Sequence, residues 1–123
     1  MIEALAVALG GALGSLGRWQ LGVLFKQWIP NLPVGTFAAN VVAGLIIGFV
    51  TGFDLASPLQ PQVKLFLAVG LCGGLSTFST FSNETLTFIQ AGNWTAAGVN
   101  IAVNVITCLV AVFIGLKLSV AMS

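Results

Sequence analysis

Long apolar runs without charge dominate the chain, and a few charged residues and short turn-forming stretches separate them. Four long stretches carry no charged side chain: residues 4–17, 27–53, 65–83 and 85–116. A helix needs about 20 mainly apolar residues to cross the hydrocarbon core of a membrane. We therefore predict an all-α integral membrane protein, with one domain over residues 1–123 and four membrane-spanning helices near 3–25, 33–53, 63–90 and 94–119.

The third predicted span is interrupted by polar residues where a plain membrane helix would carry apolar ones. Residues 73–83 read Gly-Gly-Leu-Ser-Thr-Phe-Ser-Thr-Phe-Ser-Asn, a glycine pair followed by five hydroxyl side chains. Each glycine lowers helix propensity by about 1 kcal/mol, and Ser and Thr compete for backbone hydrogen bonds. We predict a break near residues 73–77. Irregular backbone at membrane depth is tolerated only where it is buried in protein or lines a cavity, so the break is a candidate functional site.

Two features of this break each have a plain and a functional interpretation. The carbonyl groups that lose their partners can hold a small cation such as sodium, or Ser and Thr hydroxyls can repair a simple kink. The residues alone favour the kink. Phe78 and Phe81 share a helix face at a spacing of three. Their positive ring edges can touch an anion without trapping it, while ordinary core packing is the alternative.

Further polar side chains lie deep in the predicted spans. Asn40 and Asn104 are placed where an amide must find a partner, so each can join two helices or donate an N–H to an anion. The hydroxyls of Thr36, Ser79 and Thr80 can extend such a donor path. No ring of acidic residues lies in mid-membrane, which favours an anion over a cation as the permeant species.

The composition excludes several classes of function. Hydrophobic residues make up 58% of the chain and charged residues 6%, whereas a soluble domain has about a quarter charged residues. With no His and three carboxylates, acid–base catalysis has almost no material, so we expect no enzyme. Cys72 and Cys108 lie in apolar segments and predict neither a metal site nor a disulfide framework. A net charge of +1 without a basic run gives no argument for nucleic acid.

The few basic residues do not fix the orientation of the chain in a membrane. Lys64 and Lys117 fall on one side of the four spans, and Lys26 falls on the other, with Arg18 just inside the first helix. Orientation needs a clear imbalance of Lys and Arg. We therefore predict insertion in both orientations, the alternative being that a weak bias suffices. Arg18 can extend to the membrane surface, or it can draw anions into a vestibule.

Two orientations in one membrane would allow an antiparallel dimer, and small residues for close helix packing are present. Gly44, Gly48 and Gly52 form a ridge on the second span. This ridge can serve a dimer or packing within one subunit. On the fourth span, Asn100 and Cys108 lie one turn to either side of Asn104 and form one polar stripe with it.

Three motifs resemble those of the Fluc (CrcB) fluoride channels, and the likeness covers essentially the whole chain. They are Gly14-x-x-x-Arg18-Trp19, Gly35-Thr36-x-x-x-Asn40 and the run from Gly73 to Ser82. The resemblance implies an antiparallel, dual-topology homodimer with two fluoride pores in the bacterial inner membrane. It also implies passive export of fluoride, which protects the cell from fluoride toxicity. The expected partners are fluoride, membrane lipid and a second copy of the chain, with no nucleic acid.

The resemblance also implies roles for single residues of the pore. Phe78 and Phe81 match the pore-lining Phe pair of the family, and Asn40 matches its pore Asn. Thr36 matches a polar residue beside the pore, and Arg18 matches the Arg of the vestibule.

Two further matches concern the sodium ion and the fourth helix. Gly73 and Ser76 match positions whose backbone carbonyls hold a structural sodium ion at the dimer interface. Asn104 and Cys108 fall where some members carry Ser. Because a thiol is a poorer donor than a hydroxyl, this departure leaves the fourth-helix part of the path open.

Two other functions compete with a channel. A small proton-coupled multidrug transporter needs a membrane-buried carboxylate in its first helix, and Glu3 lies at the very start of the chain. A structural membrane subunit would use the glycines and asparagines for assembly alone, and the polar run of the third span argues against it. Glu84 follows that run, and the sequence assigns it no role.

Overall fold

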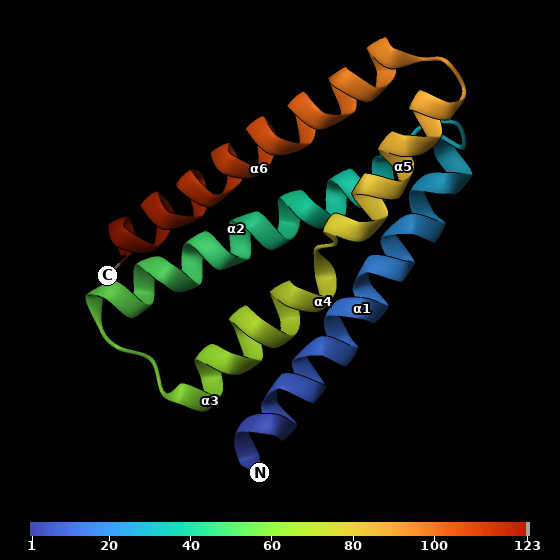
Figure 1. Ribbon diagram of the computed structural model, residues 1–123. Helices are drawn as coiled ribbons and strands as arrows, with labels where there is room; N and C mark the ends of the chain where they lie inside the picture. The colour runs from blue at the N-terminus through green and yellow to red at the C-terminus, as the bar shows by residue number, and fades with distance from the viewer. Residues whose placement is uncertain (123) are drawn as a thin grey trace.

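The computed structural model describes residues 1–122, which form helices and short connections without a strand. In chain order the helices are α1 (Ile2–Trp28), α2 (Val34–Ala56), α3 (Pro61–Lys64), the π-helical η1 (Leu65–Cys72), α4 (Gly73–Leu75), α5 (Phe78–Gln90) and α6 (Trp94–Met122). Because α3, η1 and α4 follow one another directly, the chain makes four passes, and the third is broken between α4 and α5 (Figure 1). The predicted all-α fold with a broken third helix is confirmed.

Three passes combine the length and the apolar composition needed to cross a membrane. They are Val34–Ala56, Pro61–Gln90 and Trp94–Met122, with mean hydropathies of 1.9, 1.5 and 2.4. α1 is long enough as well, since its 27 residues rise about 40 Å. It is less apolar because Arg18 and Lys26 fall in its second half. Its outward face nevertheless carries a row of exposed leucines: Leu5, Leu9, Leu13 and Leu16.

α2 and α6 lie side by side, and glycines bring their backbones into contact (Figure 1). A Cβ placed on Gly44 would lie 3.2 Å from the carbonyl oxygen of Cys108. A Cβ on Gly48 would lie 2.9 Å from the carbonyl carbon of Val112. The glycine ridge of α2 therefore packs within the subunit against α6, which is one of the two uses that the sequence left open.

The third pass lies against α1 and α2, again through small residues. A Cβ on Gly14 would lie 2.8 Å from the backbone nitrogen of Leu75, so α1 touches α4 just before the break. α1 and α2 meet further along, where a Cβ on Gly35 would lie 2.6 Å from the Cα atom of Gly22. The buried core is small and lies between α2 and the third pass: Ala39, Ala43, Cys72 and Leu75. The break thus has α1 and α2 beside it.

Candidate functional site

The break in the third pass consists of two extended residues. Ser76 has φ −81° and ψ 153°, and Thr77 has φ −151° and ψ 118°. Gly73 keeps helical angles, so the chain leaves the helix after the glycine pair and within the predicted range. Gly74 serves close packing instead, because a Cβ there would lie 3.0 Å from the backbone nitrogen of Ser15 on α1.

Side chains from two other helices take up the backbone groups that the break frees. The N–H of Thr77 donates to Oδ1 of Asn40 on α2, at 2.9 Å. The carbonyl of Gly74 accepts from Nε of Arg18 on α1, at 3.1 Å. In a continuous helix the Thr77 N–H would bond the carbonyl of Gly73, and Phe78 would bond that of Gly74. Asn40 and Arg18 therefore repair the break from two different helices.

Hydroxyls of the break bond the backbone on both sides of it. Ser76 Oγ donates to the carbonyl of Cys72 at 2.8 Å. Thr77 is the N-cap of α5, where its side chain accepts from the N–H of Thr80 at 3.2 Å. Its Oγ1 also lies 3.2 Å from the hydroxyl of Ser79. The freed groups themselves are bonded by Asn40 and Arg18, whose contributions the sequence did not reveal.

Phe78 and Phe81 form the first turn of α5 and differ sharply in exposure. Their ring centroids lie 5.6 Å apart at an interplanar angle of 55°, a tilted pair. Phe78 is 79% exposed and Phe81 is 8% exposed. One ring is therefore held inside the subunit, and the other stands out beside the break, where a second protein or lipid would meet it.

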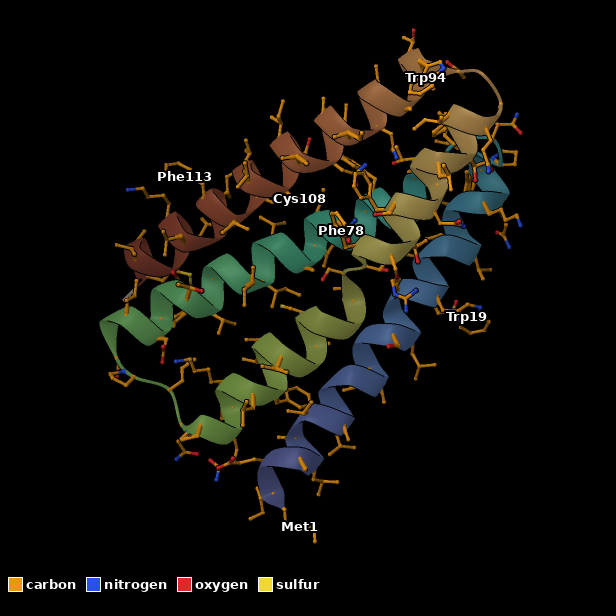
Figure 2. All side chains as sticks on the ribbon, viewed as in Figure 1. Met1, Trp19, Phe78, Trp94, Cys108 and Phe113 are labelled. Atoms are coloured by element: carbon orange, nitrogen blue, oxygen red, sulfur yellow. The ribbon has the colours of Figure 1, made fainter. Side chains whose placement is uncertain are left out.

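Many of the predicted site residues border one cavity of about 480 Å³, here named the break cavity. Figure 2 shows Phe78 at the start of α5 and Cys108 halfway along α6, two of the segments that border it. The predicted residues that line it are Asn40, Gly73, Ser76, Phe78, Phe81 and Asn104. This cavity brings the Phe pair, both Asn side chains and the proposed carbonyl positions together.

The remaining predicted residues lie elsewhere. Arg18, Thr36 and Thr80 line a separate cavity of about 300 Å³ between α1, α2 and α5, together with Lys26. Ser79 is exposed on α5 and lines neither cavity. Of the two side chains that bond the break, Asn40 lines the break cavity and Arg18 lines this second cavity.

Glu84 is a part of the site that the sequence did not reveal. Its Oε2 accepts from the hydroxyl of Thr36 at 2.9 Å, which joins α5 to α2. Its Oε1 is buried and has no hydrogen-bond partner among residues 1–122. Glu84 also lines a cavity of about 370 Å³ with Lys26. The one available signal was its position three residues after Phe81, on the same side of a helix.

A chain of hydrogen bonds joins α6 to Phe81, and it includes two residues, Asn100 and Thr85, that had no role assigned from the sequence. The amide nitrogen of Asn104 donates to the backbone oxygen and to Oδ1 of Asn100, at 2.9 and 3.1 Å. Asn100 Nδ2 donates to Thr85 Oγ1 at 3.0 Å. Thr85 Oγ1 donates to the carbonyl of Phe81 at 2.8 Å. The polar stripe of α6 is therefore engaged with α5.

These groups suit an uncharged path for an anion better than a reaction centre. The break cavity presents amide and hydroxyl groups and two aromatic rings, and no charged side chain lines it. No group of three or more His, Cys, Asp or Glu side chains that could hold a metal ion occurs within residues 1–122. The nearby charges, Arg18 and Glu84, border the neighbouring cavities instead.

Comparison with known proteins gives a consistent assignment. The family described as CrcB-like protein, Camphor Resistance (CrcB), matches residues 5–116. A fluoride-specific ion channel FluC from Pectobacterium carotovorum is 48% identical over 101 residues, which cover 81% of this chain and 80% of that protein. Its namesake from Escherichia coli O1:K1 is 47% identical over 117 residues, covering 94% and 93%. The one from Paraburkholderia phymatum is 48% identical over 118 residues, covering 94% and 92%.

Proposed function

The chain belongs to the CrcB family, and from this membership we propose that it is a fluoride-selective channel that exports fluoride passively and protects the cell from its toxicity. The observation that carries the proposal is the broken third helix, whose break lies beside a cavity lined by amide and aromatic groups without a charge. A passive channel needs no energy source. Fluoride that enters as neutral HF ionises in the less acidic cell interior, and a selective anion leak then lets it out.

Fluoride holds its water tightly, so a path for it must offer several hydrogen-bond donors in turn. Asn40 uses its Oδ1 to hold the Thr77 N–H, which turns the amide nitrogen away from the backbone and leaves it as a donor. The Phe78 and Phe81 edges add weak positive potential. Weak binding of this kind lets an ion enter and leave again. The hydroxyls of Ser79 and Thr80 and the guanidinium of Arg18 would extend this path towards one end. The Thr36 hydroxyl lies beside it but donates its only O–H to Glu84.

We infer that two copies assemble as an antiparallel homodimer in the bacterial inner membrane. The exposed ring of Phe78 beside the break and the balanced Lys and Arg residues support this assembly. A structural sodium ion between the copies would be held by the carbonyls of Gly73 and Ser76. Carbonyl oxygens suit a hard cation. The fit is supported at Gly73, whose usual helical partner, the Thr77 N–H, is bonded to Asn40 instead.

Fluoride efflux from liposomes containing the purified protein tests the proposal, with a fluoride electrode as the detector and chloride efflux as the comparison. Wild-type protein should lose fluoride fast and chloride slowly. Asn40→Asp keeps an acceptor for the Thr77 N–H but adds a negative charge. Like charges about 4 Å apart at an effective dielectric of about 20 repel by about 4 kcal/mol, so we expect fluoride flux to fall more than about a hundredfold. Phe81→Ile removes an aromatic edge and should lower flux about tenfold.

Asn93→Asp is the matched control. Asn93 also accepts from a backbone N–H through Oδ1, that of Ala96 at 3.0 Å, but it is exposed at the start of α6. The same substitution there should leave flux unchanged. Absence of fluoride flux from folded wild-type protein would refute the proposal. Proton-driven drug exchange, for which Glu84 is a partly buried carboxylate, would then be measured next.

A further inference from the structure

The hydrogen-bond chain from α6 to Phe81 has a fixed direction. A carbonyl can only accept, so the hydroxyl of Thr85 must donate to Phe81. That hydroxyl then accepts from the amide of Asn100, which leaves Asn100 Oδ1 to accept from Asn104. The orientation of both amide groups follows from this order, because a flip of either one would set two acceptors against each other.

The order of donors and acceptors in these hydrogen bonds decides which polar atom of Asn104 is left for an ion. Both hydrogen bonds of its amide nitrogen go to Asn100. Its remaining polar atom, Oδ1, is a buried acceptor without a partner among the described residues. An anion needs donors and is repelled by a carbonyl. Asn104 therefore borders the break cavity without a free donor, unlike Asn40 on α2.

The row of hydrogen bonds instead joins α5 to α6 at the level of Phe81. The Thr85 hydroxyl bond to a carbonyl one turn earlier is ordinary for a membrane helix, and Thr51 makes the same bond to Ile47. What distinguishes Thr85 is the amide of Asn100 on the same hydroxyl, which comes from a different helix. α5 starts directly after the break, so this bond fixes its first two turns to the long, continuous α6.

We propose that Asn104, Asn100 and Thr85 are positioning residues that hold Phe81 in place, and that Asn104 does not itself bind the anion. The proposal rests on the fluoride channel function proposed above. Under this proposal the row of hydrogen bonds contributes to the selectivity for fluoride over chloride, because movement of the buried Phe81 ring changes the shape of the break cavity. Hydrogen bonds in such a directed chain also strengthen one another, so all three residues should act as a unit.

The test is a set of variants assayed for fluoride and chloride efflux per folded protein. Thr85→Val removes the hydroxyl, Thr85→Ser keeps it, and Asn100→Leu removes the next link. We expect Thr85→Val and Asn100→Leu each to lower fluoride efflux about three- to tenfold, the factor for losing one interhelical hydrogen bond. The fluoride-to-chloride ratio should fall as well. Thr85→Ser should keep the wild-type fluoride efflux and the wild-type selectivity. The double variant Thr85→Val/Asn100→Leu should lose no more fluoride efflux than either single variant does.

The controls separate positioning from direct binding and from simple stability. Thr51→Val deletes an equivalent hydroxyl on α2 that faces outward, and it should leave flux and selectivity unchanged. Asn104→Leu leaves the Asn100–Thr85 bond in place, so it should lower flux no more than Asn100→Leu does. A much larger loss with Asn104→Leu, additive to that of Thr85→Val, would overturn the proposal in favour of direct binding. Wild-type flux and selectivity in Thr85→Val would also overturn it and leave the channel function standing, whereas inactive wild-type protein would refute the function itself.

Discussion

Replacing Gly48 by alanine tests the contact between α2 and α6 that supports the whole bundle. A Cβ at this position would lie 2.9 Å from the carbonyl carbon of Val112 and 3.0 Å from its Cα atom. Ordinary contacts of a Cβ begin near 3.4 Å, so the helices must separate by about 0.5 Å or more. The obstacle is backbone, which has no rotamer to move aside.

The loss of stability in Gly48→Ala follows from this displacement. A gap of about 0.5–1 Å forfeits a quarter to a half of the dispersion attraction across a packed surface, and overpacking in general costs about 1–3 kcal/mol. Alanine also gains about 1 kcal/mol over glycine in helix propensity. Gly98→Ala in α6 is the matched control, because it gains the same propensity while a Cβ there meets nothing within 4 Å. The difference between the two variants therefore isolates the overpacking cost of about 1–3 kcal/mol.

Reversible unfolding in mixed detergent micelles, followed by circular dichroism, measures this difference. Gly48→Ala should unfold at a lower denaturant fraction than Gly98→Ala, with wild-type protein between them or level with Gly48→Ala. Equal stability of the two variants would refute the reasoning, since it would mean that α6 can shift away from α2 without loss.

Two further pairs of variants test the repair of the break. Asn40→Leu should lower the free energy of unfolding by about 1–3 kcal/mol, because it strands the Thr77 N–H, whereas Asn40→Asp retains an acceptor and should be the more stable of the pair in the same assay. Arg18→Leu should destabilise by a similar amount, because the Gly74 carbonyl loses its donor, and Arg18→Lys should recover only part of this loss since Lys lacks the guanidinium fork. An Arg18→Leu protein as stable as wild type would show that the Gly74 bond contributes nothing.

The sequence predicted the helices and the break because both depend on local pattern. Apolar runs set the passes, and a glycine pair followed by hydroxyls signalled the interruption. The place of the break was less predictable, since Gly74 is used for contact with α1 and the extended residues are Ser76 and Thr77. The π-helical stretch Leu65–Cys72 had no signal either, because its apolar residues are equally typical of an α-helix.

Tertiary partners were out of reach for a different reason. Glu84 bonds Thr36 across 48 positions, and Asn100 bonds Thr85 across 15. Spacing along one helix carries no information about such pairs. The glycine ridge of α2 illustrates the same limit, because the spacing that suits a second copy also suits α6 of the same subunit.

In the proposed channel, Asn40 and Arg18 would stabilise the break and still offer donors to an anion. Each side chain makes its hydrogen bond to the backbone of the break with one polar atom: Asn40 accepts from Thr77 through Oδ1, and Arg18 donates to Gly74 through Nε. The opposite ends, an amide nitrogen and the terminal guanidinium nitrogens, keep donors that the backbone does not use. Asn104 is the converse case, because its nitrogen is bonded to Asn100 and its carbonyl is left over. A donor path through the membrane therefore depends on which end of each polar side chain the protein itself engages, as well as on which polar residues it contains.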